Sequence, residues 1–287
     1  MRTLVLTACV LQAGCTTARL NQFHGFAQAG VSYVQASQLV LDEAGNAVIQ
    51  NDSSVLRQAR PAFSPEERRD RVKRSNQLLR QRLSILRDVA RHGRLLQSYF
   101  ESLAEMADGK SEEALNKSAA AALDGVTKLG AVLSGASIGT SAVSSFVPSI
   151  TMPAVAHIRV HVLEIELRTH GKKVAEELGL QEAVFQAISN ELKTDVQSRT
   201  NLLETQEIIE PYAAEGELPK EWNTRRQEIL SASAAAQSAE VCAGAARKLR
   251  ESFEALTANK LDSVTASGLA ADIRSVLAVA ESIRKVN

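Results

Sequence analysis

Residues 129–158 read LGAVLSGASIGTSAVSSFVPSITMPAVAHI, and these thirty residues contain no Asp, Glu, Lys or Arg. Long, charged segments with helical periodicity lie on both sides of them. A segment this free of charge is normally buried in a protein core, against another chain or in lipid. Gly135 and Gly139 suit close helix contact, whereas Pro148 and Pro153 should break a helix. We therefore expect residues 129–158 to be packed within the protein or against a partner, and not to span a bilayer.

The composition favours helices. The 287-residue chain is 45% hydrophobic, and its 33 basic residues balance 33 acidic ones, so there is no overall bias toward nucleic acid. Only 15 Gly and 6 Pro are present, which argues against turn-dense all-β folds. No Pro/Gly-rich linker divides the chain. We predict an all-α fold, namely one elongated, coiled-coil-like bundle of about five to six long amphipathic helices.

The first residues, MRTLVLTACVLQAGCTTARL, have the features of an export signal. Arg2 is a minimal positive region, and a short apolar run ends in Ala13-Gly14 just before Cys15. This arrangement resembles the signal peptide and lipobox of bacterial lipoproteins, in which the cysteine is lipidated. The resemblance implies a signal peptide over residues 1–14, an acyl anchor such as palmitate on Cys15, and one helical-bundle domain over residues 15–287. A second box, Leu6-Thr7-Ala8-Cys9, makes Cys9 the alternative lipidation site.

The same resemblance bears on location. Thr16 stands where an Asp would signal retention in the inner membrane, so we expect an outer-membrane anchor with the domain facing the periplasm. Removing residues 1–14 deletes one charge, Arg2, and leaves a net charge of 33 − 33 − 1 = −1. Cys242 lies in an Ala-rich helical run and is expected to be a small buried hydrophobe.

Start and stop signals divide the chain into helices. Apolar residues recur at helical spacing over residues 17–48, after a short tether that follows Cys15, and residues 51–61 read as a loop. Ser64-Pro65-Glu66-Glu67 is a capping box that begins a helix ending near Asp108-Gly109. Ser111 caps the next helix, whose buried seam is Leu115, Ala119, Ala122, Val126, Leu129 and Leu133.

The second half of the chain repeats this pattern. Residues 154–168 fit either a helix or a strand, and the helix is favoured by the helix-forming residues that follow. Further helices are predicted over residues 181–210, ending at Pro211, and over residues 220–258. The seam of the first of these is Val184, Ile188, Leu192, Val196 and Leu203, and a final helix carries Ile273, Leu277, Ala280 and Ile283. Trp222 is expected to anchor one helix against another.

A row of basic residues follows one face of the helix that begins at Pro65. Between Arg57 and Arg94 twelve basic residues face four acidic ones, a local net charge of +8. At 100° per residue, six of them fall within about 40° of one line: Arg69, Lys73, Arg80, Arg87, Arg91 and Arg94. This row is either a solvated face that pairs with acidic neighbours or a contact surface for an anionic surface such as phospholipid headgroups.

Two patterns resemble catalytic or metal sites without completing them. Gly135-Ala136-Ser137-Ile138-Gly139 matches G-x-S-x-G, but the strand-to-helix turn that this chemistry needs is absent, and the last histidine is His170. His157, His161 and Glu164 share one helical face, which is a partial metal site that lacks a fourth ligand. We predict no enzyme activity, no cofactor and no metal.

Two function classes remain. The first is a lipid-anchored cell-envelope protein with a structural or protein-interaction role, held at the membrane by its lipid and able to meet an envelope partner or a second copy. The alternative is a membrane-active protein that inserts residues 129–158. Its plan, an uncharged segment between long amphipathic helices, is similar to that of helical pore-forming toxins of the cytolysin A class. Nucleic acid is not an expected partner, because no aromatic residues interleave with the basic ones.

Overall fold

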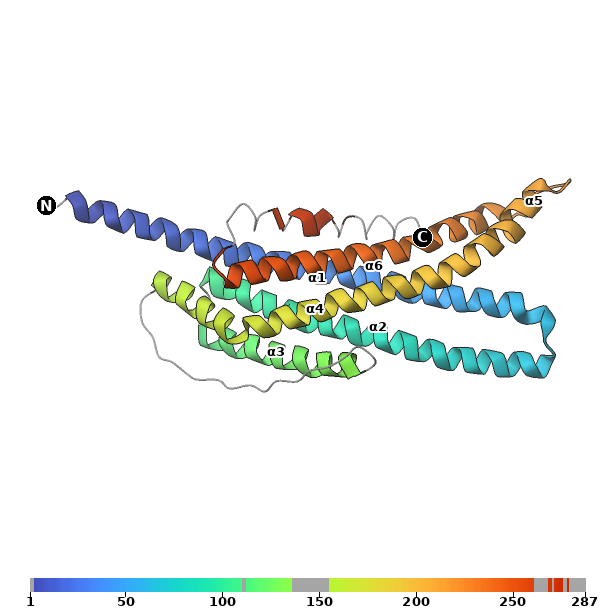
Figure 1. The fold of residues 1–287 in the computed structure, drawn as a ribbon, viewed down its shortest axis with the longest axis horizontal. Helices are drawn as coiled ribbons and strands as arrows, with labels where there is room; N and C mark the ends of the chain where they lie inside the picture. Colours follow the sequence, from blue (N-terminus) through green and yellow to red (C-terminus); the bar gives the residue numbers. More distant parts are fainter. Residues whose placement is uncertain are drawn as a thin grey trace.

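A computed structural model of the chain describes residues 3–109, 112–135, 155–260, 268–269, 271–275 and 278. Over these residues the fold is all-α, as predicted, and they include no strand. The long helices lie along a common axis and make an elongated bundle (Figure 1). They are α1 (Thr3–Ala59), α2 (Pro65–Asp108), α3 (Glu112–Gly135), α4 (Val155–Leu203) and α6 (Trp222–Thr257). Three short elements join them: η1 (Arg60–Ala62), the π-helical segment η2 (Glu204–Ile209) and α5 (Glu210–Ala213).

The bundle consists of two long helical hairpins and one shorter helix. α1 packs along α2, α4 packs along α6, and α3 lies against α2 (Figure 1). The turns of the two hairpins, at η1 and at α5, lie at the same end of the molecule, while the N-terminal part of α1 projects at the other end (Figure 1). Side-by-side packing follows from the length of these helices, because only near-antiparallel neighbours can cover an apolar stripe over so many turns.

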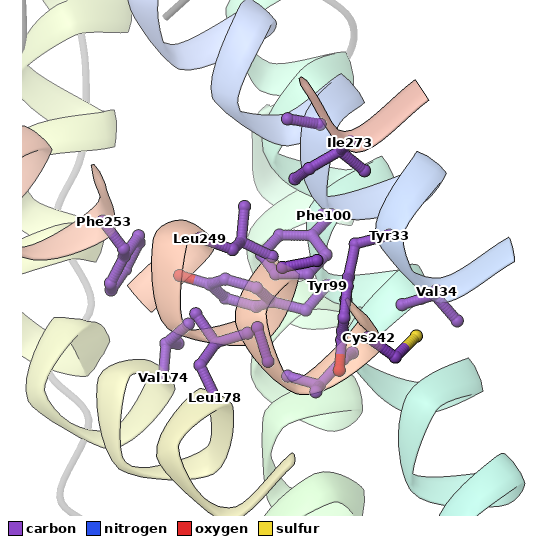
Figure 2. Close-up of a cluster of buried hydrophobic side chains, with 14 of the residues drawn as sticks. Tyr33, Val34, Tyr99, Phe100, Val174, Leu178, Cys242, Leu249, Phe253 and Ile273 are labelled. Carbon is purple, nitrogen blue, oxygen red and sulfur yellow. The ribbon is translucent and has the colours of Figure 1, made fainter. Parts of the chain in front are cut away.

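Apolar and aromatic side chains from α1, α2, α4 and α6 meet in one continuous core (Figure 2). The Phe26 ring packs edge-on against Phe100 at 5.7 Å and tilted against Phe253 at 5.1 Å, which ties together three helices. Gly30 lets α1 approach this cluster, because a Cβ at that position would lie 2.5 Å from Phe100 Cγ. The glycine is therefore needed for the close contact between α1 and α2.

The predicted start and end of α2 are confirmed. The Ser64 hydroxyl accepts a hydrogen bond from the Glu67 backbone N–H at 3.4 Å, and Glu67 Oε2 accepts one from the Ser64 backbone N–H at 2.8 Å. Pro65 takes the first helical position. Gly109 ends the helix with a left-handed backbone, φ 82°, as the C-terminal glycine of a helix commonly does.

The loop predicted over residues 51–61 is wrong, because α1 continues to Ala59. Its polar residues find partners that keep the helix intact. The Ser54 hydroxyl donates back to the Gln50 carbonyl at 2.9 Å, and the Asp52 carboxylate accepts a hydrogen bond from Ser75 of α2. Packing on α2 thus outweighs the weak local helix preference of Asn, Asp and Ser. The residues after Cys15 that were predicted to act as a short tether have helical backbone continuous with α1.

The helix interpretation of residues 154–168 is confirmed for Val155 onward, and the strand alternative is excluded. α4 runs without interruption to Leu203, so the helices predicted on either side of residues 169–180 are one. The predicted end at Pro211 is wrong, because helical backbone continues through η2 into α5. Pro211 lies in the first turn of α5, directly after the π-helical segment η2.

The predicted apolar seams face the core wherever the structure describes their side chains. The buried members are Ala119, Ala122, Val126 and Leu133 of α3 and Val184, Ile188, Leu192 and Leu203 of α4, and Leu129 is half-buried. Trp222 anchors α6 as predicted, since its indole N–H donates to the Ile208 carbonyl at 3.1 Å. Cys242 is fully buried, as expected for a small apolar side chain.

Much of the uncharged stretch lies outside the described residues. Residues 129–135 form the end of α3 and residues 155–158 the start of α4. Residues 136–154, with Ser137, Gly139, Pro148 and Pro153, are not described, so the packing predicted for them stays a prediction. Of the predicted final helix, Ile273 is buried against the core, whereas residues 277, 280 and 283 lie outside the described part.

Candidate anionic-surface interface

The six basic residues singled out in the sequence all lie exposed on one face of α2, directed away from the core. We call this set the basic row: Arg69, Lys73, Arg80, Arg87, Arg91 and Arg94. Lys73 has a long contact of 4.0 Å with Asp70, and Arg94 donates to Gln38 of α1 at 3.1 Å. The other four guanidinium groups have no partner among the described residues. The structure thus places the basic row together and mostly unpaired.

Several other cations in the described part of the chain pair with carboxylates of a neighbouring helix. Arg82, two residues from Arg80, turns toward α4 and pairs with Glu191 at 2.9 Å and Asp195 at 3.2 Å. Similar pairs join helices elsewhere: Arg57–Glu207, Lys193–Glu240, Arg247–Glu182, Arg250–Glu182 and Lys248–Asp272. The basic row lacks such acidic neighbours. Its positive potential is therefore directed at solvent, where it can attract an anionic surface.

Sequence reasoning missed a cavity at the turn between α1 and α2. We call it the tip cavity; it has a volume of about 300 Å³ and is lined by Leu56, Arg57, Ala59, Arg60, Phe63, Arg68, Arg71 and Val72. The Arg71 guanidinium lies 4.1 Å from the centre of the Phe63 ring, and Arg68 Nε donates to the Arg60 carbonyl at 2.8 Å. These contacts hold the arginines around an apolar floor. The only sequence signal was the density of arginines on both sides of Phe63.

A buried polar network in the core was also missed. Gln181 donates to His92 Nδ1 at 2.6 Å, so Nε2 carries the proton and donates to Glu177 at 2.9 Å. The Tyr33 hydroxyl completes the chain by donating to Gln181 Oε1 at 3.3 Å. His92 is fully buried, so no substrate can reach it. The network joins α1, α2 and α4 and therefore serves to position these helices.

A second buried carboxyl group lies on α4. Burial raises the pKa of Glu166 to about 7, and the nearby Tyr99 hydroxyl lowers it only in part. Neither that hydroxyl nor Glu166 Oε1 makes a hydrogen bond of good geometry. His170 lies one turn away, at 3.9 Å, and burial lowers its pKa. Two titratable groups at this distance inside a bundle point to a pH-dependent core contact.

The catalytic and metal patterns do not assemble in the part of the chain that the structure describes. His161 is exposed, and Glu164 contacts Arg19 at 3.9 Å and Arg168 at 4.0 Å. His157 and Ser137 lie outside the described side chains. Among the described residues, no group of three or more His, Cys, Asp or Glu side chains is placed to hold a metal ion. Within the same residues, none of the helices contains a stretch apolar and long enough to cross a membrane.

The side chains of Cys9 and Cys15 are outside the described part, although the backbone there belongs to α1. Among the described side chains, the first buried one is that of Arg19, four residues after Cys15. Arg19 is largely buried, donates to the Leu256 carbonyl at 2.9 Å and lies 4.8 Å from the centre of the Phe23 ring. A group attached to Cys15 would therefore connect to the bundle through one turn of helix.

Comparisons with known proteins give no relative for this chain. No family model matches it, and neither the curated proteins nor the solved structures include a significant match.

Proposed function

We propose that the protein is a lipid-anchored protein of the bacterial cell envelope with a structural or protein-interaction role. In this proposal Cys15 carries the lipid, with Cys9 as the alternative, and the anchor is in the outer membrane with the bundle facing the periplasm. The proposal includes no catalytic activity and no cofactor. Its support from the sequence is the apolar run that ends in Ala13-Gly14-Cys15.

The observation that carries the surface part of the proposal is the exposed, mostly unpaired basic row on α2. From residue 69 to residue 94 it extends over about 38 Å at 1.5 Å per residue. A rod tethered through its N-terminal helix can lie along a membrane, and then a row of this length meets many anionic headgroups at once. Each basic residue near such a surface contributes about 1 kcal/mol.

Fatty-acid labelling tests the anchor. Cells that express the chain are grown with a radioactive fatty acid. The wild type should be labelled and Cys15→Ser should not. Label that persists in Cys15→Ser but disappears in Cys9→Ser would move the anchor to Cys9. An absence of label from all forms would refute the lipoprotein assignment.

Vesicle binding tests the basic row separately. The full chain with Cys9→Ser and Cys15→Ser, which cannot be lipidated, is sedimented with vesicles of phosphatidylcholine alone or mixed with phosphatidylglycerol. Arg80→Glu with Arg87→Glu should weaken binding to the anionic vesicles by about 30-fold or more, because at least two contributions of about 1 kcal/mol are lost. Added salt should weaken wild-type binding in the same way.

The matched control is Arg168→Glu with Lys172→Glu, which changes the net charge equally on α4. These side chains are 79% and 89% exposed, so the control tests surface charge at a different place. Equal losses in both variants would show that net charge alone matters and would refute a role for the basic row. Dye leakage from the same vesicles would instead favour the membrane-active alternative.

A further inference from the structure

The loop end of the α4–α6 hairpin is acidic, whereas the tip cavity is lined by arginines. We call residues 209–221 the acidic tip. Glu210, Glu215, Glu217 and Glu221 are exposed there against a single Lys220. Large apolar side chains stand among them, with Ile209 52%, Tyr212 69% and Leu218 43% exposed. Acidic groups around exposed apolar ones are complementary to an apolar cavity surrounded by arginines.

Contacts within the chain order the acidic tip in the absence of a partner. The Tyr212 ring stacks on Trp222 with 5.8 Å between ring centres, and the Trp222 indole is fixed by its hydrogen bond to the Ile208 carbonyl. Glu207, at the base of the tip, accepts ion pairs from Arg57 at 3.4 Å and Arg225 at 2.6 Å. A preordered tip loses little conformational entropy on binding.

The acidic tip and the tip cavity lie at the same end of the molecule (Figure 1), and the Arg57–Glu207 pair joins their bases. The cavity is lined only by residues 56–72, so the acidic tip of the same chain does not fill it. From this arrangement we infer that two copies of the chain associate end to end, with the acidic tip of each copy seated on the tip cavity of the other. A two-fold axis makes both contacts at once and closes the assembly as a dimer.

Charge distinguishes a second copy from an anionic membrane at this end. A membrane of negative headgroups would attract Arg60 and Arg71 but would repel the four exposed glutamates at the same end of the molecule. A second copy is complementary to both the acidic tip and the tip cavity. The apolar side chains of one tip meet the apolar floor of the other copy's cavity, and the glutamates meet the arginines. The basic row on α2 is a different surface and stays free in this dimer.

Charge reversal gives a sharp test in the full chain carrying Cys9→Ser and Cys15→Ser. The cavity variant is Arg60→Glu with Arg71→Glu, and the tip variant is Glu215→Arg with Glu217→Arg. Sedimentation equilibrium of the unreversed chain should give twice the monomer mass as concentration rises, with weaker association in high salt. Each variant alone should associate at least about tenfold more weakly, because like charges then face each other.

Mixing the two variants should restore association. In the mixed dimer the reversed cavity of one variant meets the reversed tip of the other, and the unreversed tip of the first meets the unreversed cavity of the second, so opposite charges face each other at both contacts. A chain with all four reversals should also dimerise. Arg168→Glu with Lys172→Glu, on α4, should leave the dimer intact, and circular dichroism confirms that each variant is folded. A monomer at every concentration, or folded variants that do not associate when mixed, would overturn the inference. Anionic vesicles bound through Arg60 and Arg71 in place of dimers would also overturn it.

Discussion

Gly30→Ala should destabilise the bundle, although alanine is the better helix former. In the middle of a helix, Gly to Ala normally gains about 0.5–1 kcal/mol. At Gly30 the new Cβ would lie 2.5 Å from Phe100 Cγ and 2.7 Å from Cε2. Phe100 has no exposed surface and packs against Phe26 at 5.7 Å and Tyr99 at 5.9 Å, so its ring cannot move away freely.

Overpacking of this kind costs about 1–3 kcal/mol. Subtracting the gain in helix preference leaves a net loss of about 1 kcal/mol in the free energy of unfolding. The matched control is Gly244→Ala in α6, where a Cβ would meet nothing within 4 Å. That variant should be more stable than the wild type by about 0.5–1 kcal/mol, so the two substitutions differ in sign.

Urea unfolding followed by circular dichroism measures both free energies. A second background, Phe100→Leu, replaces the ring that the new Cβ would meet with a smaller side chain. There Gly30→Ala should be neutral or stabilising, because the clash is reduced and the helix preference remains. If Gly30→Ala stabilised the wild-type background as much as Gly244→Ala does, the close approach of α1 to Phe100 would be wrong.

Three further predictions concern the cap, the polar network and the buried carboxyl group. Ser64→Ala should lower the free energy of unfolding by about 1 kcal/mol, because the N-cap hydrogen bond is lost. Ser64→Asp should keep most of the wild-type stability, because Asp is also a good N-cap, and urea unfolding distinguishes the two variants. His92→Leu should cost about 2–4 kcal/mol because Glu177 is left buried without its partner, whereas adding Glu177→Leu should recover part of this loss; strictly additive losses in a double-mutant cycle would contradict the network. In the folded protein the pKa of Glu166 is raised to about 7, above the ordinary value of 4.5. Below pH 4.5 the carboxyl group is neutral in both the folded and the unfolded state, so its raised pKa does not lower the stability. Between pH 4.5 and 7 the unfolded state ionises first, and the free energy of unfolding falls as the pH rises. Glu166→Gln should therefore match the wild type near pH 4 and exceed it by at most about 3 kcal/mol at pH 8, and an equal difference at both pH values, measured by thermal unfolding, would refute the raised pKa.

Local signals in the sequence determined much of this fold. The capping box at Ser64 and Glu67, the stop at Gly109 and the apolar seams of α3 and α4 act over three or four residues, so they can be read without knowledge of the rest of the chain. The same holds for the alignment of the basic row, because residues on one helix face are related by the fixed turn of 100°. The position of Trp222 near a helix start likewise indicated its anchoring role.

Only the tertiary structure decided which of these residues meet. The sequence places Arg82 on a different face of α2 from Arg80, but only the structure shows that this face meets Glu191 and Asp195 of α4. His92 meets Glu177, 85 residues away, and α1 continues through a polar segment because α2 packs on it. The tip cavity and the acidic tip share one end because two hairpins of similar length lie side by side. Such contacts depend on how helices distant in the chain align, and no local rule of helix formation contains that information.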